Sequence, residues 1–236
     1  MIKLIKLELR KNNMRAYVRA SIVIAITMLG FLYLFAYAPK LEPSDKDLKI
    51  FLGYNNLIPL FGVLNMAFFC VLSSVMYSNF IIEDYSGKRL ILLFSYPISR
   101  KKILVSKLSV VSLFTVISMI ISSLMIFSIF GLTEKTMHLV SSGFTTATML
   151  QAIKVTVIMA IMAASIGVIA AGIGFIKKSV PAAIVSAVLL ASLMCNMVAN
   201  TPANMMLLYI SGLIMAFAGI IFSVHLIHKV TLMEVE

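Results

Sequence analysis

The sequence predicts an all-α integral membrane protein with six transmembrane helices, an N-terminal interfacial helix and a short cytoplasmic helix between the second and third spans. Of its 236 residues, 61% are hydrophobic and only 12% are charged, and the mean hydropathy is +1.05. A water-soluble domain cannot bury so much apolar surface. Several apolar runs also exceed about 18 residues, which is longer than core helices or strands need. We therefore expect a single membrane domain over residues 1–236.

Residues 1–19 are predicted to form a separate element that lies in the cytoplasmic interface. Ile2, Ile5 and Leu9 fall on one side of a helical wheel, and basic residues gather on another side. Glu8 falls towards the apolar side and does not fit this pattern. A simple cytosolic beginning of the first span is the alternative.

Six spans are predicted where charge disappears for about the 20 residues that cross roughly 30 Å of hydrocarbon. The fourth and fifth spans are separated only by a stretch with Lys177, Lys178 and Pro181, which favours a tight turn over one long helix. A five-span arrangement is the main alternative. The predicted spans cover about 20–38, 57–80, 106–131, 155–176, 180–199 and 206–226.

Most of the 20 lysines and arginines belong to one side of the membrane in this arrangement. They lie in the N-terminal segment and in residues 81–107, together with Lys177, Lys178 and Lys229. Because basic loops are retained in the cytoplasm, both termini are predicted to be cytoplasmic. The net charge of +11 then indicates contact with anionic membrane lipids and not with nucleic acid, since no soluble domain remains to present a groove.

The fourth span carries small residues at four-residue intervals. Ala163, Gly167 and Ala171 follow this spacing, with Ala170 and Gly174 beside them. Small residues let two helix backbones approach closely in lipid. We expect this span to pack tightly against its neighbours.

Mildly polar side chains inside the spans are candidates for a transport pathway. None of the spans has an ionisable residue near its middle, which argues against an ion-coupled transporter. A row of hydroxyl side chains in the third span can line a path for an amphipathic substrate, and interhelical hydrogen bonding is the alternative. The candidate pathway residues are Asn65, Ser112, Thr115, Ser118, Ser122 and Asn196.

The sequence predicts no catalytic site and no metal site. Cys70 and Cys195 fall in different spans, and His225 and His228 have no Cys, Asp or Glu nearby to complete a ligand set. The glycines of the fourth span are not followed by the Lys-Ser/Thr pair that a P-loop needs to hold phosphate and magnesium. We expect no nucleotide site in this chain.

Residues 81–104 form a charged island that is predicted to be a cytoplasmic docking element. Ser86 and Gly87 can turn the chain out of the membrane, and residues 90–94 form a short helix with an apolar face. Pro97 ends that helix, and Ser99 is well placed to cap the next one. A compact helix held between two spans can pass motion from a soluble partner into the membrane. An ordinary basic loop is the alternative.

This island, together with the six-span plan, resembles the membrane subunits of ABC-2 type ATP-binding cassette exporters. In that family an acidic residue, a glycine, a pair of leucines, a Pro-x-Ser-Arg motif and a later lysine follow the second span. The resemblance covers almost the whole chain at the level of topology. The matching residues here are Glu83, Gly87, Leu92-Leu93, Pro97-Ile98-Ser99-Arg100 and Lys107.

The resemblance implies a bacterial, multi-pass permease subunit of the cell membrane that is not itself an enzyme. Two ABC ATPase subunits would bind ATP and Mg²⁺, and a second permease copy or a related permease would complete the complex. The implied substrate is an antimicrobial or amphipathic peptide or a drug, moved for export or self-immunity. The residues implied to couple to the ATPase are Glu83, Asp84, Gly87, Lys88, Arg89, Leu92, Leu93, Pro97 and Arg100.

Two functions of other classes compete with this interpretation. A non-transporting membrane anchor or sensor that recruits a cytosolic partner would also need a docking island. A membrane enzyme is disfavoured because the acidic and histidine side chains do not converge: Glu83 and Asp84 are predicted to lie inside, and Glu134 and His138 outside.

Overall fold

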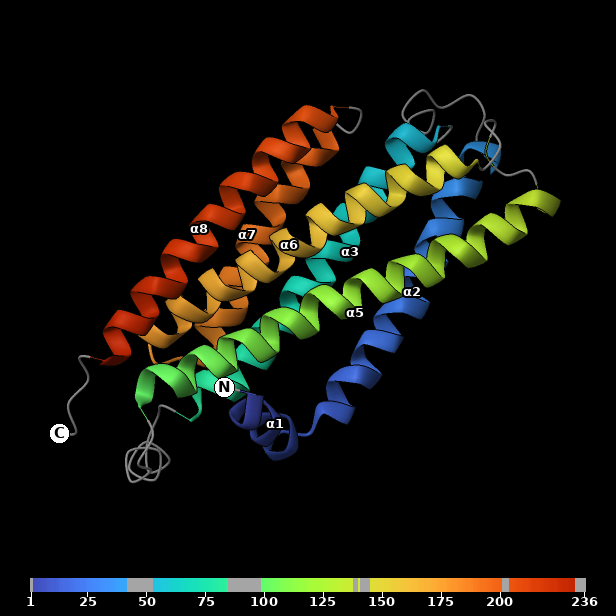
Figure 1. Cartoon of the computed structure of the whole chain (residues 1–236). Coiled ribbons are helices and arrows are strands. Elements are labelled where there is room, and N and C mark those ends of the chain that lie inside the picture. Colours follow the sequence, from blue (N-terminus) through green and yellow to red (C-terminus); the bar gives the residue numbers. More distant parts are fainter. Residues whose placement is uncertain are drawn as a thin grey trace.

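The computed structural model describes residues 2–41, 53–84, 99–137, 140, 145–200 and 204–231. All regular secondary structure in these ranges is helical, and six helices are long and apolar enough to cross a membrane. The helices run side by side as an elongated bundle (Figure 1). The predicted fold class, an all-α membrane protein with six spans, is confirmed.

Each predicted span falls within one helix or within the continuous pair α3 and η2. The helices extend beyond the predicted spans because backbone hydrogen bonding continues past the apolar residues, into positions where polar side chains are tolerated. In chain order the helices are α1 (Ile2–Lys11), α2 (Met14–Leu41), α3 (Tyr54–Tyr77), the π-helix η2 (Ser78–Ile82), α5 (Arg100–Met137), α6 (Thr146–Ile176), α7 (Val180–Asn200) and α8 (Met205–Thr231).

Helix α6 is the centre of the bundle and packs against α3, α5, α7 and α8. In its most apolar window 78% of residues are buried, compared with 17% in α2 at the edge. A Cβ atom added at Gly167 would lie 2.2 Å from Ser73 Oγ, and one at Gly174 would lie 2.5 Å from Ala183 Cβ. The predicted close packing of the small residues in this span is therefore confirmed.

A tight turn separates α6 from α7, so the five-span alternative is wrong. The N–H of Ser179 donates to the carbonyl of Gly174 at 3.0 Å, and the N–H of Lys178 donates to Phe175 at 3.2 Å. Lys178 has a φ of 48°, and together these features form a Schellman motif that ends α6. Pro181 lies in the first turn of α7, where a missing N–H costs nothing.

The N-terminal helix α1 is shorter than the predicted 1–19 element. It ends at Lys11, and α2 begins after a two-residue turn, at Met14. Helix α1 packs against α5, while its position in a membrane interface remains a prediction.

One end of the bundle gathers α1, the end of η2, the start of α5, the α6–α7 turn and the end of α8 (Figure 1). We call this the basic end, because most of the lysines and arginines are predicted to lie on this side of the membrane. The end of α5 and the start of α6 lie at the opposite end.

Candidate functional site

Four charged side chains meet at the basic end, and we call Glu8, Lys11, Asp84 and Lys107 the ion cluster. The Lys107 ammonium donates a hydrogen bond to Asp84 Oδ2, and Lys11 Nζ lies 2.5 Å from the same oxygen. Glu8 Oε1 lies 3.9 Å from Lys107 Nζ. The cluster thus joins α1, the chain directly after η2, and α5.

Lys107 is the buried centre of the ion cluster. Its side chain is 0% exposed, and its ammonium also donates to the Phe80 carbonyl at 2.6 Å. An ammonium group removed from water is costly unless it is paired and hydrogen-bonded. Two carboxylates balance two ammonium groups here, so the cluster is neutral and its elements are held in one mutual arrangement.

The π-helix η2 places Asp84 at this position. The N–H of Glu83 donates to the carbonyl of Ser78 at 3.0 Å, which is the five-residue spacing of a π-turn. Such a turn is wider than an α-turn and changes which side chains face inward beyond it. Asp84 is buried beside Lys107, and its neighbour Glu83 is exposed.

The Asp84 carboxylate is held in its charged form. Burial alone would raise the pKa of this group, but hydrogen bonds from Lys107 and Lys11 outweigh burial and hold the pKa below its usual range. The carboxylate is therefore ionised at neutral pH, so both ion pairs are formed.

Helix α2 is joined to the same region by an aromatic and polar contact. The Tyr17 hydroxyl accepts a hydrogen bond from Asn79 Nδ2 at 2.7 Å, and the rings of Tyr17 and Phe80 have centroids 6.1 Å apart. The end of η2 is thus tied to α1, α2 and α5 within a few residues.

Of the predicted coupling residues, Asp84 is part of the ion cluster and Glu83 is exposed beside it. Helix α5 begins at Arg100, directly after Ser99, whose carbonyl accepts from the Ile103 N–H at 3.3 Å. The coupling helix itself remains a prediction. Gly87, Lys88, Arg89, Leu92, Leu93, Pro97 and the side chain of Arg100 lie outside the described residues.

Sequence reasoning did not place Glu8, Lys11 and Lys107 in one site. The signal for Glu8 was present, because this residue did not fit the amphipathic pattern of its helix. The structure gives the reason: Glu8 faces the ammonium of buried Lys107 on α5. The sequence did not show which distant charge it would meet.

The predicted pathway residues are not brought together in one place. Asn65 Nδ2 donates to Ser123 Oγ at 3.0 Å, and this bond connects α3 with α5. The hydroxyls of Ser112 and Tyr77 lie 2.7 Å apart in a second bond between the same helices. Asn65 and Ser112 therefore make hydrogen bonds between helices, which is the alternative to a pathway-lining role.

The other hydroxyl residues of α5 have local roles in the described structure. Thr115 donates to the Val111 carbonyl and Ser122 donates to the Met119 carbonyl, both within α5. Ser118 is half-buried on the same helix. A lining role for these three side chains remains a prediction.

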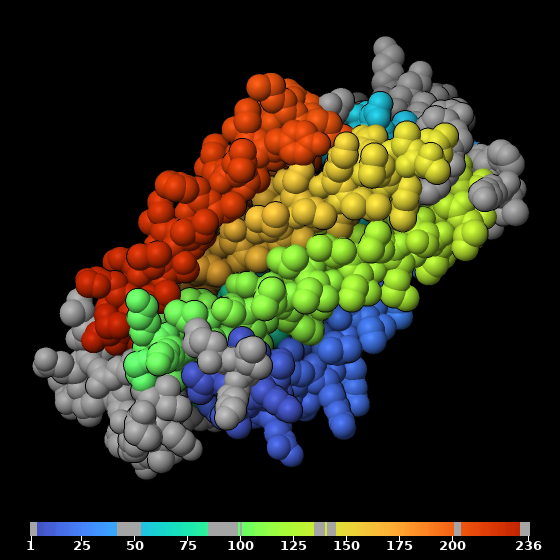
Figure 2. Space-filling view, in the orientation of Figure 1, coloured from blue at the N-terminus to red at the C-terminus, as the bar shows by residue number. Residues whose placement is uncertain are grey.

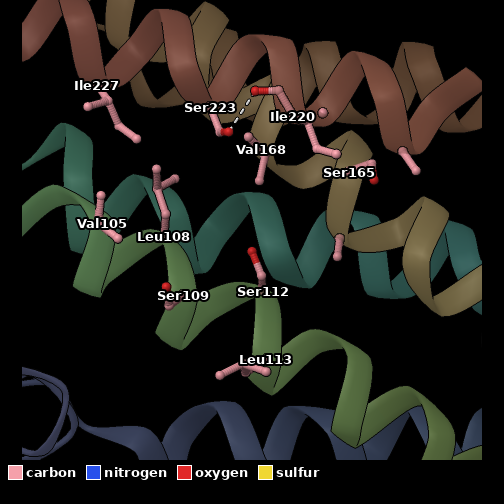
Figure 3. Close-up of a pocket in the computed structure, with 13 residues that line it drawn as sticks. Val105, Leu108, Ser109, Ser112, Leu113, Ser165, Val168, Ile220, Ser223 and Ile227 are labelled. Atoms are coloured by element: carbon pink, nitrogen blue, oxygen red, sulfur yellow. Dashed lines mark hydrogen bonds between the residues drawn. The ribbon is translucent and has the colours of Figure 1, made fainter. Parts of the chain in front are cut away.

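Two grooves on the bundle contain the remaining polar candidates. The serine groove, about 470 Å³, lies between α5, α6 and α8 and is lined in part by Ser109, Ser112, Ser165 and Ser223 (Figure 3). The asparagine groove, about 440 Å³, lies between α3 and α7 and includes the side chain of Asn196. The two grooves are therefore separate sites that share no helix.

The described part of the chain has no group of three or more His, Cys, Asp or Glu side chains that could hold a metal ion. The ion cluster contains only two carboxylates, and both face lysines. Its geometry is suited to holding helices together.

Comparison with known proteins assigns the chain to a family. Residues 4–193, which include the ion cluster and all helices from α1 into α7, match the family model described as ABC-2 family transporter protein. The chain belongs to the ABC-2 family. Its resemblance to ABC-2 membrane subunits is thereby confirmed, and the chain is a multi-pass permease subunit of an ABC transporter.

A relative of this ABC-2 protein is the Bacillus subtilis (strain 168) protein YcbO, which is described as uncharacterized. The two are 28% identical over 195 residues, which cover 83% of this chain and 84% of YcbO. No solved structure matches the chain.

Proposed function

We propose that this ABC-2 protein is the transmembrane subunit of an ATP-driven exporter whose basic end faces the cytoplasm. Both termini are then cytoplasmic, which agrees with the positive-inside rule. Two ABC ATPase subunits dock at residues 81–104 and bind ATP and Mg²⁺. A second permease chain, either a copy or a relative, completes the complex.

The ion cluster is the observation that carries this proposal. Asp84 lies near the start of the predicted docking segment, residues 81–104, and α5 begins near the end of that segment, at Arg100. The bond between Asp84 and Lys107 joins the two flanks, and Lys11 ties α1 to them. A partner that moves the docking segment therefore moves these helices together, as rigid-body switching requires.

The asparagine groove supports a second permease chain. Ser192 and Asn196 are exposed on α7, within a span that would otherwise face hydrocarbon. The Ser192 hydroxyl donates to the Leu189 carbonyl at 2.8 Å within α7, so the Asn196 amide is the group that a facing helix would pair. Amide and hydroxyl groups exposed to lipid are unfavourable, whereas a facing helix can supply hydrogen-bond partners. We place the second chain over this groove, with the substrate path between the two chains.

The proposed substrate is an amphipathic or antimicrobial peptide or a drug. The asparagine groove is lined mainly by small apolar residues, with the polar groups of Ser192, Cys195 and Asn196 among them. A surface of this mixture suits a molecule that has both apolar and polar parts. We propose that the transporter moves this substrate out of the cytoplasm or out of the membrane.

Copurification tests the proposal directly. The tagged chain is extracted from its native membrane in mild detergent, and the eluate is analysed by mass spectrometry and by an ATPase assay. We expect a stoichiometric ABC ATPase, lost in Gly87→Asp and Leu93→Asp variants and kept in Lys154→Gln, a charge change of the same size and sign at the opposite end. Reproducible absence of an ATPase, with the chain intact, would favour a membrane anchor or sensor.

Substrate class is tested in a sensitive bacterial host. Cells that express the permease and its ATPase are challenged with a panel of amphipathic peptides and drugs, and growth inhibition is measured. Protection that requires ATP hydrolysis supports export. Equal protection by a hydrolysis-deficient ATPase would show that the complex sequesters these compounds instead of transporting them.

A further inference from the structure

The serine groove is an elongated hollow on the outside of the bundle. Helices α5 and α8 form its walls and α6 forms its floor, which is visible between them in Figure 2. At the floor, a Cβ atom added at Gly219 would lie 2.9 Å from Ser165 Cβ, so α8 touches α6 closely there. Both α5 and α8 pack against α6, and the groove is the space left between α5 and α8 on the surface of α6.

Three of the four serine hydroxyls that line the groove, those of Ser112, Ser165 and Ser223, are hydrogen-bonded within the protein. Ser165 donates to the Ile161 carbonyl at 2.8 Å, and Ser223 donates to the Ile220 carbonyl at 2.7 Å (Figure 3). Ser112 is bonded to Tyr77. Because these donors are satisfied, the groove presents a mainly apolar surface, and a hydrocarbon chain fits it better than a hydrated ligand does.

The groove lies in the half of the bundle near the basic end. It follows α5 from Val105 to Leu113 and reaches Ile227 near the end of α8. In a membrane this position corresponds to one leaflet, at the side where η2 ends and α5 begins. Lipid tails are the molecules that surround a groove on this outer face.

Exposed positive charge lies at the end of the groove. Lys101 precedes Val105 by four residues and therefore lies on the same face of α5, one turn closer to the basic end. Lys102 is exposed beside it. The carboxylates of Glu8 and Asp84 are directed to the ion cluster, so they do not neutralise these two lysines.

We propose that the serine groove binds one phospholipid with an anionic headgroup. One acyl chain lies in the groove along α5 and α8, and the headgroup phosphate lies against Lys101 and Lys102. Long lysine side chains reach the headgroup level readily, and basic sites between transmembrane helices attract anionic headgroups. The site is distinct from the asparagine groove, where we place the second permease chain.

Native mass spectrometry tests this site with defined lipids. The full-length chain is released from vesicles that contain equal amounts of phosphatidylglycerol and phosphatidylcholine with identical acyl chains, and bound lipids are counted. We expect one retained phosphatidylglycerol. Lys101→Glu/Lys102→Glu should lower its affinity about tenfold or more while leaving phosphatidylcholine binding unchanged. Lys154→Glu, at the opposite end, should change neither.

Filling the groove is the second arm. Ser109→Phe places a ring in the serine groove and should abolish retention of the lipid, whereas Ser192→Phe in the asparagine groove should not. The lysine variants alter only exposed side chains, so they keep the test decisive if Ser109→Phe does not fold.

Three results would overturn the proposal. Equal retention of the two lipids by the wild type would remove the headgroup site. Unchanged retention in a folded Ser109→Phe variant would remove the groove. A photo-crosslinking residue at Leu113, which is exposed in the groove, should capture lipid. Capture of a second copy of the chain instead would assign the groove to a protein interface.

Discussion

Substitution of Asp84 or Lys107 tests whether the ion cluster holds the basic end together. In Asp84→Asn the buried Lys107 ammonium, which is 0% exposed, loses its paired carboxylate. It keeps the hydrogen bond to the Phe80 carbonyl and the Glu8 carboxylate 3.9 Å away. Removing one partner of a buried pair costs about 3–5 kcal/mol of unfolding free energy, because the other charge remains buried. We expect a loss in this range for Asp84→Asn, and a smaller loss for Lys107→Met, since Asp84 keeps Lys11.

A double variant separates the energy of the Asp84–Lys107 ion pair from the packing contribution of each side chain. Asp84→Asn/Lys107→Met removes both charges, so its cost should fall below the sum of the two single costs by about 1–3 kcal/mol. Lys11→Met is the control within the same cluster. Its side chain is 52% exposed, and an ion pair in that environment contributes about 0–1 kcal/mol.

Unfolding is followed for all four variants and the wild type in the same detergent, by denaturant titration and by thermal melting. If the loss of unfolding free energy in the double variant equals the sum of the two single losses, Asp84 and Lys107 are not a coupled pair. A Lys11→Met loss as large as that of Lys107→Met would also refute a buried pair, because the cost should come from burial, and Lys11 is half exposed whereas Lys107 is buried.

Three further predictions concern other parts of the structure. Gly167→Ala should cost about 1–3 kcal/mol, because its Cβ would lie 2.2 Å from Ser73 Oγ, whereas Gly30→Ala in open space should cost nothing in the same melting assay. The pKa of Asp84 is lowered in the folded state, so its stabilising contribution is complete above about pH 4, the unfolded value, and is lost as pH falls further. The stability difference between wild type and Asp84→Asn should therefore be constant from about pH 5 to 8 and shrink in stronger acid, as measured by unfolding midpoints. A double-mutant cycle of Asn65→Leu and Ser123→Ala, followed by denaturant titration, should give a coupling energy of about 0.6 kcal/mol, the average for a hydrogen bond between transmembrane helices, and zero coupling would mean that the bond to α5 is not formed in the membrane.

The number of spans and the tight packing of α6 could be predicted because both follow from local sequence. Apolar length determines what can cross a bilayer, and small residues four apart lie on one helix face wherever that helix packs. Even the α6–α7 turn was indicated by two lysines and a proline within six residues. None of these inferences required knowledge of which helices are neighbours.

The ion cluster could not be predicted in the same way. Its members are at positions 8, 11, 84 and 107, and only tertiary packing determines which of the many basic residues at this end meets which acid. The π-turn that directs Asp84 inward has no sequence pattern comparable to an apolar run. Similarly, the hydroxyl row of α5 is regular along the helix, yet Ser112 bonds to Tyr77 while Thr115 bonds within its own helix.

The first turns of α5 connect the ion cluster with the serine groove. Lys107 is two residues from both Val105 and Ser109, and residues two apart lie about 200° around a helix from each other, on opposite faces. One face of this segment is therefore held by Asp84, and the other forms a wall of the groove. We therefore predict that a shift of α5 relative to α8, transmitted from the proposed docking segment through Asp84, would change the width of the groove between these two helices. In that case, lipid bound in the proposed site and a partner bound at the proposed docking segment would influence each other, because each would act on the position of the same helix.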